Sequence, residues 1–276
     1  MDATHKKYLR MNKLPHIWCP GCGDGTIMGS FIRAIDRLGY DKDDVAAVSG
    51  IGCSGRITGY LDFNTLHTTH GRALAFATGV KMAKPRLKVF VFMGDGDATA
   101  IGGNHLIHSC RRNIDITAII FNNNIYGMTG GQYSPTTPRD KYATTAPYGT
   151  TDPHFDIAKL CIGAGASYVA RGTSYHAKML TDLIVAGAEH KGFSVIEIIT
   201  HCPVNFGRRN ELETPVDMLL WQKDHAVRMA KAEKMTADEL ADRFIIGELH
   251  KADIPEYVEE YDRLIERVQR GDTGRG

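Results

Sequence analysis

Short apolar runs alternate with longer segments of helical character up to about residue 200, and this alternation most constrains the fold. Runs of this length predict strands buried on both faces, with helices between them. Such a pattern indicates an α/β fold, so we expect a doubly wound, mostly parallel sheet. The predicted strands are Val45–Ser49, Leu87–Met93, Ile116–Phe121, Ala166–Ala170 and Val195–Thr200. The predicted helices are Thr26–Leu38, Arg72–Lys84, Ala98–Arg112, Phe155–Gly163 and Tyr175–Lys191.

The character of the chain changes after the last predicted strand. Charged amphipathic helices are expected at Thr214–Lys234 and Thr236–Lys251, and Gly271–Gly276 has the composition of a frayed end. We therefore expect a main domain over residues 1–210 and a C-terminal helical appendage over 211–276, which is a candidate subunit interface.

Composition and charge exclude several classes of partner. The 33 basic and 32 acidic residues leave a net charge of +1, which gives no broad attraction for nucleic acid or an anionic membrane. The apolar runs fall far short of the roughly 20 residues of a spanning helix, and Met1–Arg10 lacks the apolar core of a secretory signal. We therefore expect a cytoplasmic protein without nucleic-acid or membrane partners.

A reducing compartment argues against disulfides, and Cys110 and Cys161, inside predicted helices, are expected to be buried free thiols.

Polar residues follow two consecutive predicted strands at the point where each strand ends. Gly94-Asp95-Gly96-Asp97 follows the first strand, and Asn123 follows the second, 28 residues after Asp95. A right-handed crossover makes these strands parallel and brings their carboxyl ends to one edge of the sheet. A carboxylate, an amide oxygen and a backbone carbonyl near Ile125 suit Mg²⁺, which usually shares its oxygen ligands with phosphates. The glycines at 94 and 96 let the backbone approach a ligand closely, and the unpaired N–H groups at the helix start near Ala98 can bind an anion.

Each half of this pattern alone is also compatible with an ordinary turn. Together, the Gly-Asp-Gly and the asparagines that follow resemble the thiamine diphosphate signature in order, spacing and strand context. The dinucleotide fingerprint fits poorly, because Thr99 stands where its third glycine is needed. The long segment Tyr126–Pro153 shows neither the helical nor the strand periodicity of apolar residues, and such long loops within compact domains are usually functional.

Four further cysteines are expected at the same edge of the sheet. Cys19 and Cys22 form a Cys-x-x-Cys pair, whereas Cys53 and Cys202 each follow a predicted strand. Four thiolates that converge can hold either Zn²⁺ or a [4Fe–4S] cluster, and the spacing leaves both open. A position beside a cofactor that generates electrons favours the cluster.

The order of these motifs resembles that of the β subunit of 2-oxoacid:ferredoxin oxidoreductases, most closely the 2-oxoglutarate branch. The resemblance covers about residues 13–210. The motifs that carry it are Cys19-Pro-Gly-Cys22-Gly, Gly50-Ile-Gly-Cys53-Ser-Gly-Arg56, His70-Gly-Arg-Ala-Leu-Ala-Phe-Ala-Thr-Gly79, Gly94-Asp-Gly-Asp97, Arg111-Arg-Asn-Ile-Asp115 and Tyr126-Gly-Met-Thr-Gly-Gly-Gln132.

The resemblance implies a thiamine-diphosphate-binding fold and assigns site residues. The implied metal ligands are Cys19, Cys22, Cys53 and Cys202 for one [4Fe–4S] cluster, and Asp95, Asn123 and the carbonyl of Ile125 for Mg²⁺. The implied thiamine diphosphate contacts are Ile51, Gly52, Cys53, Ser54, Gly96, Asp97, Gly127 and Met128. Two catalytic candidates are His70, whose loop should border the same pocket, and Arg56, whose guanidinium can bind the distal carboxylate of 2-oxoglutarate through two hydrogen bonds.

The resemblance also implies a reaction and partners. A 2-oxo acid is decarboxylated, coenzyme A receives the acyl group, and electrons pass through the cluster to ferredoxin. The glutamate that activates thiamine has no counterpart in these 276 residues, so an α subunit must supply it, in an αβ or (αβ)₂ assembly. Coenzyme A is expected to bind largely to that subunit.

Three alternatives stay open on the sequence alone. In the first, the substrate is pyruvate or another 2-oxo acid instead of 2-oxoglutarate. In the second, the chain is a non-redox thiamine enzyme with a structural zinc. In the third, it is a metal-binding scaffold without activity. Brown colour and iron in the purified protein would separate the leading interpretation from the zinc enzyme.

Overall fold

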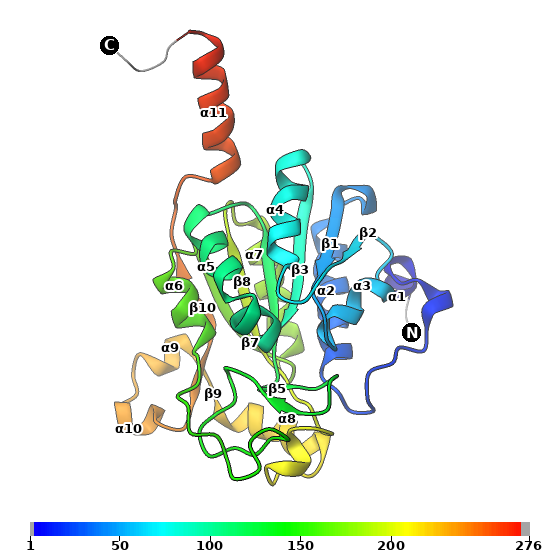
Figure 1. Ribbon diagram of the computed structural model, residues 1–276, viewed down its shortest axis with the longest axis vertical. Coiled ribbons are helices and arrows are strands. Elements are labelled where there is room, and N and C mark those ends of the chain that lie inside the picture. The colour runs from blue at the N-terminus through cyan, green and yellow to red at the C-terminus, as the bar shows by residue number, and fades with distance from the viewer. Residues whose placement is uncertain (1–2, 272–276) are drawn as a thin grey trace.

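The computed structural model describes residues 3–271 and is built around one eight-stranded sheet (Figure 1). Its strands are β1 (Val45–Ser49), β2 (Asn64–His67), β3 (Lys88–Gly94), β4 (Thr117–Asn122), β7 (Tyr168–Thr173), β8 (Ser194–Ile199), β9 (Ala226–Arg228) and β10 (Phe244–Lys251). They lie in the order β2-β1-β3-β4-β8-β7-β10-β9, and only the β7–β10 pair is antiparallel. The predicted α/β fold with a mostly parallel sheet is confirmed.

Helices cover both faces of this sheet. The helices are α1 (Ala3–Tyr8), α2 (Asp24–Leu38), α3 (Ile57–Tyr60), α4 (Ala73–Ala83), α5 (Gly103–Arg112), α6 (Ile157–Gly163), α7 (Ala177–Glu189), α8 (Pro215–His225), α9 (Met229–Ala232), α10 (Ala237–Leu240) and α11 (Tyr257–Gln269). Short 3₁₀ turns occupy Met11–Lys13, Lys42–Asp44, Ser54–Arg56 and Gly207–Arg209. In the described part of the chain, no helix has the length and apolar character needed to cross a bilayer.

The hydrophobic core lies in two layers because successive residues of a strand face opposite sides of the sheet. On β3, Phe90 and Phe92 pack with Phe31 of α2 in one layer. Val89 and Val91 pack in the other layer, which contains α4, α5 and α6. Cys110 and Cys161 are buried in this second layer as free thiols, as expected.

The predicted helix Ala98–Arg112 has a different start. Residues Asp97–Ile101 form a π-helical turn, and α5 follows only from Gly103. π-Helical turns are frequent at functional sites because the wider turn changes the direction of side chains and backbone groups. This turn directly follows the Gly-Asp-Gly motif at the end of β3.

The prediction for the C-terminal segment is partly wrong. The expected helix Thr214–Lys234 ends at His225 and gives way to β9 and α9, and the second half of Thr236–Lys251 is the strand β10 rather than helix. Strand β10 carries the β-branched pair Ile245 and Ile246, which pair with β9, and its second half covers the edge of β7 that would otherwise be unpaired.

Helix α11 is not among the predicted helices, and it extends away from the sheet at the top of Figure 1. Of the predicted frayed end, residues 272–276 lie outside the described residues. The division of the chain at residue 210 stays a prediction.

Asn113 connects α5 to the segment that leads to α11. Its backbone is left-handed, with φ of 52°. Its side-chain nitrogen donates to the carbonyls of Ile254 (3.0 Å) and Pro255 (3.1 Å), and its oxygen accepts from the Phe193 amide (2.8 Å) and the Ser167 hydroxyl (2.5 Å). Asn113 is 3% exposed, so every one of these groups would lose a partner inside the protein if the side chain were removed.

We expect Asn113→Ala to lower the free energy of unfolding by about 3 kcal/mol, because it leaves buried donors and acceptors without hydrogen-bond partners and puts alanine in a left-handed conformation. Asp140→Ala is the matched control, since Asp140 has φ of 63° and is exposed. The control should cost about 1 kcal/mol from backbone strain alone. Denaturant unfolding of both variants measures the difference, and equal losses would show that the Asn113 hydrogen bonds do not stabilise the fold.

Candidate cofactor and metal site

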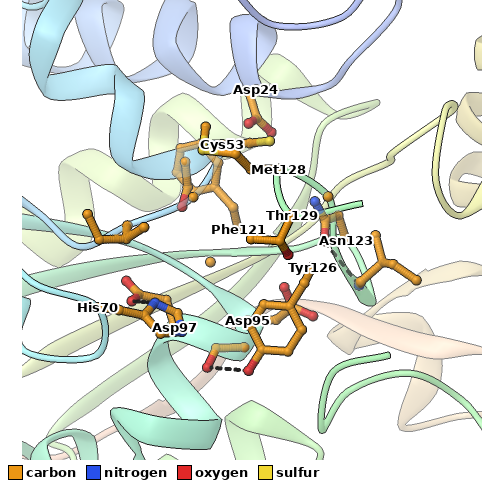
Figure 2. Close-up of a pocket in the computed structure, with 17 residues that line it drawn as sticks. Asp24, Cys53, His70, Asp95, Asp97, Phe121, Asn123, Tyr126, Met128 and Thr129 are labelled. Atoms are coloured by element: carbon orange, nitrogen blue, oxygen red, sulfur yellow. Dashed lines mark hydrogen bonds and ion pairs between the residues drawn. The ribbon is translucent and has the colours of Figure 1, made fainter. Parts of the chain in front are cut away.

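One pocket opens at the carboxyl ends of β1, β3 and β4 (Figure 2). In Figure 2, Asp24 and Cys53 lie near one end of it, and His70 and Asp97 lie near the other. The lining residues are Asp24, Ile51, Gly52, Cys53, Ser54, His70, Gly94, Asp95, Gly96, Asp97, Phe121, Asn123, Ile125, Tyr126, Gly127, Met128 and Thr129. Every residue that the sequence assigned to thiamine diphosphate or Mg²⁺ is in this set, as is His70.

Asp95 is a buried carboxylate at the end of β3. Its Oδ2 accepts hydrogen bonds from the hydroxyls of Ser134 (2.6 Å) and Thr136 (2.5 Å). Burial raises the pKa of Asp95 to about 6, although the two hydroxyl groups act in the opposite direction. The hydroxyls belong to the aperiodic segment between residues 126 and 153, so this loop is held against the pocket through Asp95.

The turn that follows β4 is fixed by the same loop. Asn124 has φ of 60°, and the Asn123 side-chain oxygen accepts from the Ile125 amide at 3.2 Å. The Thr137 hydroxyl donates to the Asn124 carbonyl at 2.6 Å. Asp95 and the asparagine turn therefore face one pocket from adjacent strands, and one loop contacts both. A carboxylate, an amide oxygen and a carbonyl in this arrangement fit a hard cation.

His70 and Asp97 form a pair at the wall of the pocket. His70 Nδ1 lies 2.6 Å from Asp97 Oδ1, which also accepts from the Gly71 amide at 2.6 Å. Burial raises the pKa of Asp97, and the Gly71 amide and His70 oppose that shift. These contacts direct the Asp97 carboxylate toward His70 and Gly71, and the assignment of Asp97 to the diphosphate, which the resemblance implies, stays a prediction.

The predicted cluster cysteines gather beside the pocket. The sulfur atoms of Cys53 and Cys202 each lie 3.5 Å from the position that a Cβ on Gly127 would occupy, so they are at most twice that distance apart. Burial raises the pKa of Cys22, and the charges of Cys53 and Cys202 add to the shift. Burial also raises the pKa of Cys53 to about 12, with a contribution from Cys19. Thiols with raised pKa values need a bound cation to ionise.

The solvent exposure of these cysteines is graded. Cys19 is exposed, Cys22 and Cys53 are half-buried, and Cys202 is buried. Asp24 lies beside them and lines the pocket, and burial raises its pKa to about 7. Within residues 3–271, no three His, Cys, Asp or Glu side chains are grouped closely enough to hold a single metal ion. A [4Fe–4S] cube has four separate iron corners, so its ligating sulfurs lie farther apart than those around one ion.

Arg56 is not part of the pocket lining. It is the exposed last residue of the turn Ser54–Arg56, whose other two residues are buried, and it lies directly before α3. Its expected contact with a distal carboxylate stays a prediction.

Comparison with known proteins agrees with this geometry. The family model for the thiamine pyrophosphate enzyme C-terminal TPP-binding domain matches residues 50–198. The chain is 52% identical to the 2-oxoglutarate synthase subunit KorB of Methanocaldococcus jannaschii, over 95% of this chain and 97% of that protein. It is 44% identical to the β subunit of 2-oxoacid:ferredoxin oxidoreductase 2 of Aeropyrum pernix, over 67% of this chain and 60% of that protein.

The chain belongs to the 2-oxoacid:ferredoxin oxidoreductase β-subunit family. A solved structure supports this at the level of the fold. The 2-oxoglutarate:ferredoxin oxidoreductase of Magnetococcus marinus, with 2-oxoglutarate, coenzyme A and succinyl-CoA bound, matches with a TM-score of 0.86 and 34% identity. The match covers 96% of this chain and 90% of that one. The family resemblance of the sequence motifs is therefore confirmed, and the chain is a subunit of an oxidoreductase.

Sequence reasoning missed several groups in this β-subunit site. Ser134, Thr136 and Thr137 follow Gln132-Tyr133 in a Ser-Pro-Thr-Thr segment, and nothing in its composition connects it to Asp95. Tyr126 donates to the Gly96 carbonyl at 3.2 Å and closes the pocket wall. A hydroxyl-rich segment within a long loop was the only available signal, because these contacts form between segments far apart in the chain.

Gly50 is needed where the β1 loop passes the His70–Asp97 pair. A Cβ on Gly50 would lie 1.8 Å from Asp97 Oδ2. We expect Gly50→Ala to lower the free energy of unfolding by about 3 kcal/mol, because the buried carboxylate must move from its partners. Gly79→Ala is the control: Gly79 lies in α4 with nothing within 4 Å of its Cβ position, so alanine should stabilise by about 0.5 kcal/mol. Thermal or denaturant unfolding measures both, and a neutral Gly50→Ala would contradict the close approach.

Proposed function

We propose that this chain binds thiamine diphosphate and Mg²⁺ in the pocket at the carboxyl ends of β1, β3 and β4. One observation carries the proposal: Asp95, Asn123 and Ile125 share a pocket with the loop of Cys53 and with the backbone at Gly96 and Gly127. Asp95, the Asn123 amide and the Ile125 carbonyl would hold Mg²⁺. The glycines allow the backbone to approach a diphosphate closely.

The four cysteines Cys19, Cys22, Cys53 and Cys202 are proposed to hold one [4Fe–4S] cluster. Support comes from the closeness of Cys53 and Cys202 to Gly127 and from the charge interactions among all four. Because Cys53 borders both the pocket and the cysteine group, electrons need to travel only a short way between them. The exposed Cys19 gives the cluster an edge toward solvent, where an electron acceptor such as ferredoxin can approach.

The proposed reaction is the oxidative decarboxylation of 2-oxoglutarate, with coenzyme A as the acyl acceptor and ferredoxin as the electron acceptor. The substrate assignment rests on the names of the relatives and on the ligands of the Magnetococcus marinus enzyme. Thiamine diphosphate, when bound, supplies the electron sink for decarboxylation. This chain holds the cofactor, and His70 lines the same pocket with its Nδ1 2.6 Å from Asp97 Oδ1.

A partner subunit is proposed to complete the site. The activating glutamate, and most of the coenzyme A site, are assigned to an α subunit in an αβ or (αβ)₂ assembly. Ile51 and Met128 line the pocket and are 38% and 47% exposed, and large apolar side chains at the rim of a site suit a protein partner. The segment after residue 210 is a further candidate interface, and a cytoplasmic location is retained as a proposal.

Two reciprocal variants test the proposal in the purified αβ complex. Asp95→Asn keeps the shape and an oxygen for the Ser134 and Thr136 hydroxyls but removes the only carboxylate proposed for Mg²⁺. It should retain about a tenth or less of the bound thiamine diphosphate with iron unchanged. Cys202→Ser should lose iron and sulfide with thiamine diphosphate unchanged, since a hydroxyl is a poor substitute for a soft thiolate. Wild-type thiamine diphosphate in the first variant, or wild-type iron in the second, would refute the respective site.

A further inference from the structure

A continuous row of polar contacts, buried along most of its length, leads from the start of α6 to the asparagine turn. The Arg171 Nε on β7 donates to Glu197 Oε2 on β8 at 2.7 Å, and the Asn122 side-chain nitrogen on β4 donates to Glu197 Oε1 at 2.8 Å. On its other side, the Arg171 guanidinium donates to Asp156, the N-cap of α6, at 2.5 Å. These residues occupy three neighbouring strands and the start of a helix, and Asn122 is the last residue before Asn123.

The register of the strands explains the contacts. Arg171 pairs with Glu197 across β7 and β8, and Glu197 pairs with Ile120 across β8 and β4. Asn122 lies two residues beyond Ile120 and therefore points to the same face, diagonally opposite Glu197. The carboxylate thus stands between a cation and an amide at the edge of the sheet that borders the pocket.

This row places two charged side chains in the interior of the sheet. Glu197 is 2% exposed and is the only charged residue of β8, and Arg171 is 8% exposed. Taking both charges from water is costly, and a buried ion pair often stabilises a fold no more than apolar side chains of the same volume. Stability alone therefore does not account for the row, whereas fixing one geometry does.

Glu197 decides the orientation of the Asn122 amide. A carboxylate paired with arginine can only accept hydrogen bonds, so the amide must present its nitrogen to Glu197. Its oxygen is then turned toward the Asn124 amide, which donates to it at 3.3 Å. That contact supports the left-handed Asn124 and, with the Thr137 hydroxyl on the Asn124 carbonyl, sets the path of the backbone through Asn123 and Ile125.

We propose that Glu197, held by Arg171, is a positioning residue that orients Asn122 and thereby fixes the turn from which Asn123 and the Ile125 carbonyl meet Mg²⁺. The proposal rests on the proposed function. Neither Glu197 nor Arg171 is among the residues that line the cofactor pocket, so they act through Asn122 rather than by contact with the cofactor. Groups that orient metal ligands typically contribute about 10- to 100-fold to metal affinity.

The test uses the αβ complex freed of thiamine diphosphate and Mg²⁺, with the dissociation constant for added thiamine diphosphate measured by calorimetry over a series of Mg²⁺ concentrations. Glu197→Gln should weaken binding about 10- to 100-fold, because glutamine can present either an oxygen or a nitrogen to Asn122. The loss should shrink as Mg²⁺ is raised, because the defect lies in the metal ligands.

Two further variants separate positioning from general destabilisation. Lys81→Met breaks another buried ion pair, in which Lys81 Nζ lies 2.6 Å from Asp115 Oδ2 and donates to the Leu87 carbonyl, away from the pocket lining. It should lower the melting temperature but leave the affinity for thiamine diphosphate unchanged. Asn122→Ala removes the amide, while Glu197 keeps its pairing with Arg171. If both residues act on the same turn, the losses of affinity for thiamine diphosphate in Asn122→Ala and Glu197→Gln should not add in the double variant.

The outcomes are distinguishable. Glu197→Gln with wild-type affinity, or additive losses in the double variant, would overturn the positioning role while the proposed function stands. Equal affinity losses in Glu197→Gln and Lys81→Met would do the same, since they would show an effect of stability alone. If Glu197→Gln does not fold, Asn122→Ala alone must show the Mg²⁺-dependent loss, and wild-type binding in it would refute the proposal. A wild-type complex that binds no thiamine diphosphate would instead refute the proposed function.

Discussion

Burial of the Asp95 carboxylate at the carboxyl end of β3 is the constraint on which the site depends. A carboxylate removed from water needs hydrogen-bond donors, and Ser134 and Thr136 provide them from a loop about forty residues later in the chain. The loop is thereby held against the pocket, where the Thr137 hydroxyl also donates to the Asn124 carbonyl. One buried charge thus organises both the proposed metal ligands and the loop that contacts them.

The parallel sheet explains why the pocket and the cysteine group lie side by side. The loops after β1, β3, β4 and β8 all leave the sheet at one edge, and they carry Cys53, Asp95, Asn123 and Cys202. Cys53 belongs to both the pocket and the cysteine group, so a cofactor that releases electrons and a cluster that accepts them would be separated by little protein. The Glu197 contacts join β7, β8 and β4 at this edge.

The sequence predicted the parts of this fold that follow from burial. The run at β1 was predicted with its observed bounds, and those at β3 and β4 within one residue, because apolar β-branched residues fill buried parallel strands. Motif spacing and strand order brought Asp95 and Asn123 to the pocket, whereas the residues expected to contact thiamine diphosphate came from the family resemblance. The hydroxyls of Ser134 and Thr136 could not be found, since their partner is distant in sequence. Strand β10 was predicted as helix because charged residues surround its short β-branched run, which pairs with β9, while the rest of the strand pairs with β7. Glu197 lay within a predicted strand, but its partners depend on the register of three strands.

The central claim is that the thiamine pocket and the four-cysteine site act together at one edge of the sheet. The most direct test is a single turnover of the anaerobic αβ complex with 2-oxoglutarate and coenzyme A, without ferredoxin, followed by visible absorption and by electron paramagnetic resonance. The account predicts that one of the two electrons from 2-oxoglutarate reduces the cluster, which bleaches the visible iron–sulfur absorption and gives the paramagnetic signal of a reduced [4Fe–4S] cluster. Release of CO₂ with no change in either spectrum would contradict it.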